Sequence, residues 1–345
     1  MKKNFLLQTA ARAGCIAVAL TVCAARAEEE NWLKHFRVGG TIALNIKAKF
    51  KTEGQFVVPG NAAGSPGTGG SHFYDDGYVR PDQGSDPNYT SYWGYNNSGQ
   101  NPPGTDLLNF HSVKSFTTTG NSGEETDWAA GLDAAYGADL GRWGNIWYGW
   151  ELGFNFLPAK ITEKSGAAAT FIRTVHQYNT GGILLPEAPY AGGDSGVGPN
   201  LPNTATAQPD DTIGGTINSS RTLRASVYSL RLGPTLLWEF GRHVALSVNG
   251  GPAVAYVTAE YESKDTLTTS DGGRTQISDS FDDDKFLFGG GVGVTVMFHT
   301  VESADIYIGA QFMTLGDMSL SRGGRKAELD LSAGIYLSAG VNWPF

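Results

Sequence analysis

The histidines are the first candidates for acid–base chemistry, because the ordinary pKa of histidine lies near neutrality. Six are present: His35, His72, His111, His176, His243 and His299. None belongs to a His-Glu-x-x-His motif, and the sequence has no Gly-x-Ser-x-Gly motif and no glycine-rich phosphate loop after a strand. His111 precedes Ser112, but adjacent strand residues point to opposite faces. We therefore expect no enzyme and no cofactor; a hydrolase assembled from distant residues is the least favoured alternative.

Two acidic runs are candidate sites for a divalent cation. They are Asp75-Asp76-Gly77 and Asp282-Asp283-Asp284. Carboxylate oxygens are the ligands that Ca²⁺ and Mg²⁺ prefer, but the EF-hand spacing is absent. The more ordinary interpretation is that these runs keep exposed loops soluble.

Aromatic side chains are concentrated in one segment rich in glycine, proline and asparagine. They are Phe73, Tyr74, Tyr78, Tyr89, Tyr92, Trp93 and Tyr95. Amphipathic aromatics are favoured at recognition surfaces, including flat sugar-binding faces. The favoured alternative is a loop that packs on itself as a lid.

Composition excludes several classes of function. The chain has 345 residues and a net charge of -9, which argues against a nucleic-acid partner. Its only cysteines are Cys15 and Cys23. A disulfide scaffold, a thiolate zinc site and a cysteine nucleophile are therefore excluded from residue 24 onward.

The first 27 residues are typical of a signal peptide. Lys2 and Lys3 precede an apolar stretch over 13–24, and Ala25-Arg26-Ala27 has the form of a signal-peptidase site. We expect residues 28–345 to form one exported domain. No later apolar run reaches the ~18 residues that a membrane-spanning helix needs.

Eight segments alternate apolar with polar or small residues. They are 36–51, 128–140, 146–156, 224–240, 243–258, 286–298, 304–313 and 328–345. Such alternation predicts an antiparallel up-and-down β-barrel that spans a membrane, since lipid requires a closed sheet. A soluble β-sandwich is the alternative, but its strands are shorter. Segments 106–118 and 168–178 also look like strands; we place them above the membrane, and counting them would give ten strands.

The polar rows are expected to face the lumen. The predicted lumen charges are Arg37, Lys47, Lys49, Asp133, Glu151, Arg231, Asp305 and Asp330. Eight strands enclose a space that side chains fill, and opposite charges in it tend to pair, so we expect a closed barrel. The aromatics expected at the membrane interfaces are Trp128, Tyr148, Trp150, Trp238, Phe240 and Trp343.

The connections predict the orientation. The long ones are 51–127, 157–222, 259–285 and 314–327; the short ones are 141–145, 241–242 and 299–303. Bacterial barrels have short periplasmic turns and long extracellular loops. Both termini are therefore expected in the periplasm.

The chain resembles small bacterial outer-membrane barrels of the OmpA, OmpX and OmpW type. The resemblance depends on the signal peptide, the alternating last strand and the terminal Trp343-Pro344-Phe345. It implies that Phe345 is part of the signal read by the barrel-insertion machinery, and that outer-membrane lipid and lipopolysaccharide surround the protein. The long first loop, with residues 74–79 and 92–95, is similar to loops of uncharacterised long-looped barrels and implies no activity. We expect a structural anchor or a surface-interaction protein, with a narrow porin-like channel as the alternative.

Overall fold

The computed structural model describes residues 34–59, 70–192, 198–301 and 304–345. The predicted signal peptide, residues 1–27, lies outside these ranges. Within them, no helix has the length and apolar character needed to cross a membrane.

The wall of the molecule is a closed ring of eight antiparallel strands. In order around the ring they are β1 (Lys34–Val57), β6 (Leu107–Trp143), β7 (Ile146–Asn179), β10 (Asp211–Phe240), β11 (Val244–Thr269), β12 (Arg274–Val301), β13 (Ala304–Thr314) and β16 (Gly334–Pro344). The ring closes because β1 pairs with both β6 and β16. The predicted eight-stranded antiparallel barrel is therefore confirmed. The segments 106–118 and 168–178 contribute to the far ends of β6 and β7 and add no strands to the ring.

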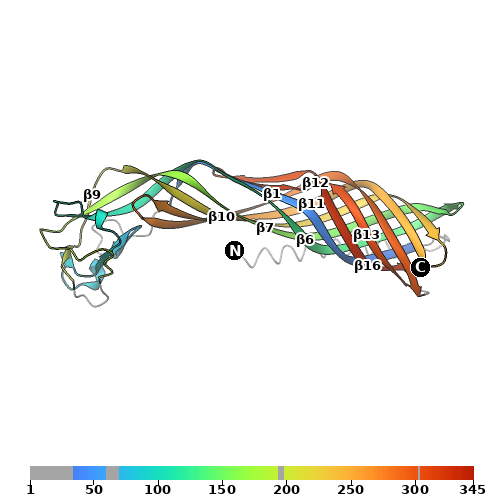
Figure 1. The fold of residues 1–345 in the computed structure, drawn as a ribbon, viewed down its shortest axis with the longest axis horizontal. Coiled ribbons are helices and arrows are strands. Elements are labelled where there is room, and N and C mark those ends of the chain that lie inside the picture. Colours follow the sequence, from blue (N-terminus) through green and yellow to red (C-terminus); the bar gives the residue numbers. More distant parts are fainter. Residues whose placement is uncertain (1–33, 60–69, 193–197, 302–303) are drawn as a thin grey trace.

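Several strands are far longer than a membrane crossing requires. β6 has 37 residues, β7 has 34 and β10 has 30, against the ~9–11 that span a bilayer. The predicted loops 51–127 and 157–222 are therefore wrong in extent, because strands occupy much of both ranges. Figure 1 shows these strands running along the molecule toward the short strands of the connecting segments.

The strands continue because the upper part of the barrel has a hydrophobic interior of its own. In β7 the outward row reads Trp150, Leu152, Phe154, Phe156, Pro158, Lys160, Thr162 and Lys164. The inward row reads Glu151, Gly153, Asn155, Leu157, Ala159, Ile161 and Glu163. Apolar residues thus change from the outer to the inner face just beyond Phe156. We call the part below this reversal the lower barrel and the part above it the upper barrel.

In β1 the same reversal is made by the backbone. Asn45 has a positive φ of 61°, and the pairing with β6 shifts between Ala43 and Ile46. Ile42 and Leu44 therefore face outward, whereas Ile46 and Phe50 face the core. A bulge adds one residue, and one residue turns every later side chain to the other face. The single unbroken row predicted for 36–51 is wrong beyond Asn45.

The predicted last strand, 328–345, is likewise two strands. β14 (Asp317–Arg322) and β15 (Arg325–Asp330) form a hairpin, and β16 begins only at Gly334. β15 and β16 pair in turn with the upper and lower parts of β1. Leu329 and Leu331 are buried, while Ile335 and Leu337 are exposed on the outer face. The carbonyl of Ala333, in the break, accepts a hydrogen bond from the Asn45 side chain at 3.0 Å.

Aromatic residues mark both edges of the outward apolar band. At the upper edge Phe156, Tyr228, Tyr256 and Phe286 form a row on adjacent strands, with successive ring centroids 4.9, 6.5 and 5.0 Å apart. Near the lower edge, Phe36 stacks on Trp343 at 6.2 Å. Phe286 and Phe298 are twelve positions apart in β12, and Val292 midway between them is 60% exposed. Strands of this length, tilted by ~40°, give a band of ~30 Å, slightly taller than the ~25 Å of membrane barrels.

The short turns and the chain ends lie at the lower end. The connections between β6 and β7, β10 and β11, and β12 and β13 are there, and the backbones of Lys34 and Phe345 exchange hydrogen bonds of 2.9 and 2.8 Å. At the opposite end lie β2 (His72–Tyr74), β3 (Gly77–Val79), β4 (Tyr89–Thr90), β5 (Trp93–Tyr95), β8 (Leu201–Pro202) and β9 (Thr206–Ala207), with the 3-10 turns η1 (Pro81–Gln83) and η2 (Ser98–Gln100). We call the described residues of 70–106 and 180–210 the cap.

Candidate functional site

The lumen of the lower barrel is crossed by a cluster of charged side chains. The Oε1 atom of Glu151 accepts hydrogen bonds from Arg37 and Arg231, both at 3.1 Å, and from Asn249 at 3.0 Å. Asp133 lies 3.9 Å from Arg37. The hydroxyl of Tyr307 in β13 donates a hydrogen bond to Asp133 at 3.0 Å. We call these six residues the lumen cluster.

The lumen cluster joins strands from most of the ring. Its members come from β1, β6, β7, β10, β11 and β13, and its charged members are nearly buried. The charge of a buried carboxylate is compensated when it lies between two guanidiniums. A buried carboxylate or guanidinium without its partner would destabilise the fold. The cluster therefore fills and braces the lumen.

Above the lumen cluster, the upper barrel is filled by apolar side chains. Ile46, Phe50, Leu157, Ile161, Leu223, Val257 and Tyr261 belong to one buried cluster. Higher still, Arg221 is fully buried and pairs with Glu163 at 2.7 Å. Arg325 of β15 is also buried and pairs with Asp265 at 2.7 Å and with Asp279 at 3.4 Å. The interior thus holds a polar layer in the lower barrel, an apolar layer above it and further buried ion pairs above that.

The predicted position in the lumen is wrong for three of the eight charged residues. Lys47, Lys49 and Asp330 lie on the outer face of the upper barrel, where Lys47 is 4.0 Å from Glu124 and Lys49 is 3.9 Å from Glu328. The bulge at Asn45 and the break after Asp330 reverse the facing of these segments. The other five, Arg37, Asp133, Glu151, Arg231 and Asp305, are buried on the inner face. Asp305 lies at the lower end, 2.8 Å from His299 and 3.1 Å from Asn342.

The predicted interface aromatics all lie on the outer face of the lower barrel. Trp128 is exposed near its upper edge. Tyr148, Trp150, Trp238, Phe240 and Trp343 lie in the half of the band nearer the short turns. Phe345 is exposed beside them, and its role in barrel insertion stays a prediction.

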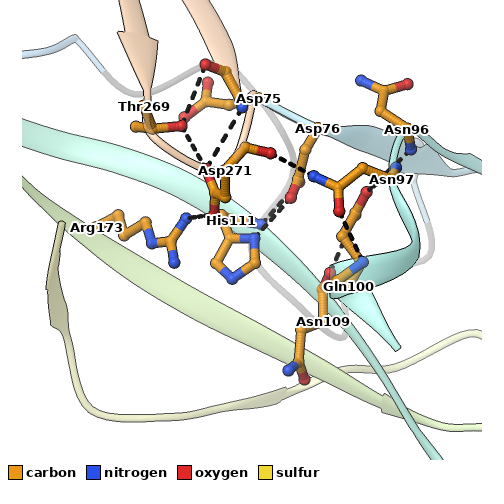
Figure 2. A network of polar contacts seen from close by, with 12 residues as sticks. Asp75, Asp76, Asn96, Asn97, Gln100, Asn109, His111, Arg173, Thr269 and Asp271 are labelled. Carbon is orange, nitrogen blue, oxygen red and sulfur yellow. Dashed lines mark hydrogen bonds and ion pairs between the residues drawn. The ribbon is translucent and has the colours of Figure 1, made fainter. Parts of the chain in front are cut away.

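A second polar network joins the cap to the barrel (Figure 2). Asp75 and Asp76 lie between β2 and β3, and their carboxylates accept hydrogen bonds from the backbone N–H groups of Val113 at 2.6 Å and His111 at 2.9 Å. Asn97 bonds to the carbonyl of Asp271 in the β11–β12 hairpin.

Arg173 of β7 anchors the same hairpin. Its guanidinium pairs with Asp271 and also with both oxygens of Asp211, at 2.8 and 3.0 Å. Partial burial raises the pKa of Asp271, but the hydrogen bond from Thr269 and the contact with Arg173 outweigh it and hold the pKa below its ordinary value. The carboxylate is therefore ionised near neutral pH and fixes the hairpin against β7, while the Asp271 carbonyl bonds to the cap.

The cap shares a small aromatic core with the adjoining ends of β6 and β7. Tyr74, Val79, Trp93, Tyr95, Leu108, Phe110, Tyr178 and Leu201 are buried together. Of the seven aromatics predicted for recognition or for a lid, Tyr74, Trp93 and Tyr95 are buried, whereas Phe73 and Tyr89 are 45% and 47% exposed. The geometry therefore agrees with self-packing for the buried three and leaves Phe73 and Tyr89 at the surface.

A histidine–carboxylate pair is present that the sequence did not reveal. The Nδ1 atom of His111 lies 2.6 Å from Asp76 Oδ2. The two residues are 35 positions apart, so no local spacing motif could have shown the contact. No hydroxyl or thiol partner of His111 is recorded among the described residues. The absence of catalytic activity stays a prediction.

Cation binding by the acidic runs also stays a prediction. Asp75 and Asp76 are engaged by peptide N–H groups and by His111. Asp282, Asp283 and Asp284 lie in β12 and not in a loop. Among the described residues, no group of three or more histidine, cysteine or acidic side chains is arranged to hold a metal ion.

Acidification is expected to loosen the cap through His176. Burial lowers the pKa of His176, and His72, His111 and Lys114 lower it further while Asp76 raises it. Its buried Nδ1 has no hydrogen-bond partner among the described residues, and its ring centroid lies 5.0 Å from that of Tyr74. The folded cap thus favours the neutral imidazole. This stabilisation is complete above the unfolded pKa of ~6.5 and is lost as the pH falls below it.

Amide hydrogen exchange of residues 70–106 between pH 7.5 and 5 measures this effect. Protection should decrease with falling pH in the wild-type protein and decrease less in His176→Gln. An equal response of the two proteins would show that His176 is not the titrating group.

Comparisons with known proteins find matches among solved structures alone. No protein-family model matches the sequence, and no curated protein matches it either. The outer membrane protein OprG from Pseudomonas aeruginosa is 11% identical, with a TM-score of 0.35 over 91% of this chain and 96% of that chain. The outer membrane protease OmpT from Escherichia coli is 11% identical, with a TM-score of 0.29 over 92% and 99%. A FadL homologue from Pseudomonas aeruginosa is 10% identical, with a TM-score of 0.21 over 91% and 90%.

The barrel fold rests on the strand pairing. At these identities and TM-scores the matches assign neither a family nor an activity.

Proposed function

We propose that this chain is an integral barrel of the bacterial outer membrane, a closed anchor that presents its cap for interactions at the cell surface. The main support is that apolar side chains face outward in the lower barrel and inward in the upper barrel. Apolar side chains cover the outside of the lower barrel, and charged side chains cover the outside of the upper barrel. Lipid contact explains the first surface and water the second. A soluble sandwich would bury the apolar row against a second sheet.

The closed interior supports an anchor. The lumen cluster and the apolar cluster above it lie one after the other along the axis, so a solute would have to displace both. The upper barrel then acts as a stalk that holds the cap away from the membrane. Phe73 and Tyr89, exposed on the cap, are the aromatic side chains available for a partner.

Surface labelling tests this orientation. Because both native cysteines precede residue 24, single cysteines at Ser85 in the cap and at Asn145 in the β6–β7 turn would be specific reporters. An impermeant maleimide added to intact cells should label Ser85→Cys and leave Asn145→Cys unlabelled until the outer membrane is opened. Labelling of the turn in intact cells, with none of the cap, would contradict the orientation.

A narrow channel is the second candidate, because several buried polar atoms in the lumen have no hydrogen-bond partner among the described residues. They include Nε and Nη1 of Arg37, Oε2 of Glu151 and Nε2 of Gln311. Buried groups of this kind are commonly satisfied by water. A solvated passage through the lower barrel would still meet the apolar cluster above it.

Planar-bilayer recording separates the two candidates. The anchor predicts no steady conductance from the purified wild-type protein. Removing the charges of the lumen cluster should not open the barrel either, because the apolar cluster remains in place. Large, steady conductance from the wild-type protein would favour the channel.

A further inference from the structure

An open groove of about 820 Å³ crosses four adjacent strands of the upper barrel. It is lined by residues of β7, β10, β11 and β12 at one level of the sheet. Lys164 of β7 and Lys264 of β11 both lie opposite Ser220 of β10, one from each side. The two lysines therefore lie on either side of a central serine.

The groove lies on the outer face of the wall. Between the outward residues, Ser165, Ser219 and Asp265 turn into the barrel. There they bond to Arg221 at 2.7 Å, Asn121 at 3.2 Å and Arg325 at 2.7 Å. The one carboxylate that lines the groove is thus engaged inside the barrel.

The side chains left in the groove are positive or neutral hydrogen-bonding groups. Besides the two lysines they include Asn218, Ser220, Thr266, Gln276 and Ser278. Hydroxyls and amides both donate and accept hydrogen bonds, as sugar hydroxyls do. Lysine is a common point-charge partner for phosphate.

The two lysines differ from three other lysines on the outer face of the upper barrel, Lys47, Lys49 and Lys326. Lys49 and Lys326 lie 3.9 and 3.0 Å from the carboxylate of Glu328, and Lys47 lies 4.0 Å from Glu124. Within the described part of the chain, the ammonium groups of Lys164 and Lys264 make no ion pair or hydrogen bond. Their charges are therefore available to an anion from outside the chain.

The height of the groove indicates the source of that anion. Lys164 is eight residues beyond Phe156 on the outward row of β7, which is ~20 Å above the apolar band for a strand tilted by ~40°. In the proposed outer membrane, this height corresponds to the layer of sugars carried by the glycolipid of the outer leaflet. We propose that the groove binds a phosphorylated sugar of lipopolysaccharide, held by Lys164 and Lys264 through its phosphate and by the neutral side chains through its hydroxyls. This inference rests on the proposed outer-membrane location.

Titration of the detergent-solubilised full-length protein with purified lipopolysaccharide tests the site. The variant is Lys164→Gln/Lys264→Gln, and the matched control is Lys49→Gln/Lys326→Gln, which removes the same charge from a paired site. We expect the first to bind at least about tenfold more weakly and the control to bind nearly as the wild type does. Affinity of the wild type should also fall with rising salt. Equal weakening of the two variants, or none in either, would overturn the proposal.

Two further ligands identify the chemistry. Lipopolysaccharide treated with phosphatase should lose most of the difference between wild type and variant, and retention of the full difference would overturn the role of phosphate. Inorganic phosphate should compete only at far higher concentration; binding as tight as that of the glycolipid would show a site for free anions instead. These titrations are independent of cell-surface labelling. The proposed binding site can therefore be wrong while the membrane location is right, and the membrane location can be wrong while the site is right.

Discussion

Replacing Glu151 with alanine should lower the free energy of unfolding of the barrel by about 3–5 kcal/mol, the cost typical of breaking a buried ion pair. The carboxylate is 2% exposed and accepts hydrogen bonds from Arg37, Arg231 and Asn249. Its removal leaves two guanidiniums in the lumen with Asp133 as the nearby carboxylate. Urea unfolding of the refolded protein in lipid vesicles, followed by tryptophan fluorescence, measures the loss.

The control for this prediction is Glu262→Ala. Glu262 lies 2.7 Å from Arg224, but both side chains are partly exposed on the outer face, and such pairs contribute ~0–1 kcal/mol. Glu151→Gln, which keeps an acceptor but removes the charge, should fall between the two. If Glu151→Ala and Glu262→Ala unfolded at the same urea concentration, the lumen cluster would not brace the barrel as described.

Replacing Val292 with arginine should cost about 2–4 kcal/mol, the value for an arginine on the lipid face at the midplane of a membrane barrel. Val292 lies midway between the aromatics at the two edges of the apolar band. Ser280→Arg is the matched control, because Ser280 lies on the same outward row of the same strand but above the reversal of facing. An exposed surface substitution of that kind is expected within ±0.5 kcal/mol.

The same unfolding measurement in lipid vesicles compares the two arginine variants. Retained stability of Val292→Arg would mean that the outward row of the lower barrel does not contact hydrocarbon. A large loss in Ser280→Arg would instead mean that the apolar environment extends above Phe286. Either result would contradict the membrane position assigned to the lower barrel.

The sequence alone determined the closed antiparallel barrel, its eight strands and the inward position of Arg37, Asp133, Glu151, Arg231 and Asp305. These follow from alternation, which is a local property: neighbouring strand residues face opposite sides wherever the backbone stays regular. The same rule identified the outward aromatics from Trp128 to Trp343. Pairing of opposite charges in a narrow lumen led us to expect a closed interior, and this expectation stays a prediction.

Only the tertiary structure decided where apolar side chains change from the outer to the inner face, and which contacts join the cap to the barrel. A single residue in an unusual conformation, Asn45, turns Lys47 and Lys49 outward, and the break at 331–333 does the same for Asp330. The contacts between His111 and Asp76 and between Arg173 and Asp271 join residues 35 and 98 positions apart. A bulge depends on the partner strand and a long-range contact depends on the path of the chain, so neither is written in the periodicity of the segment that contains it.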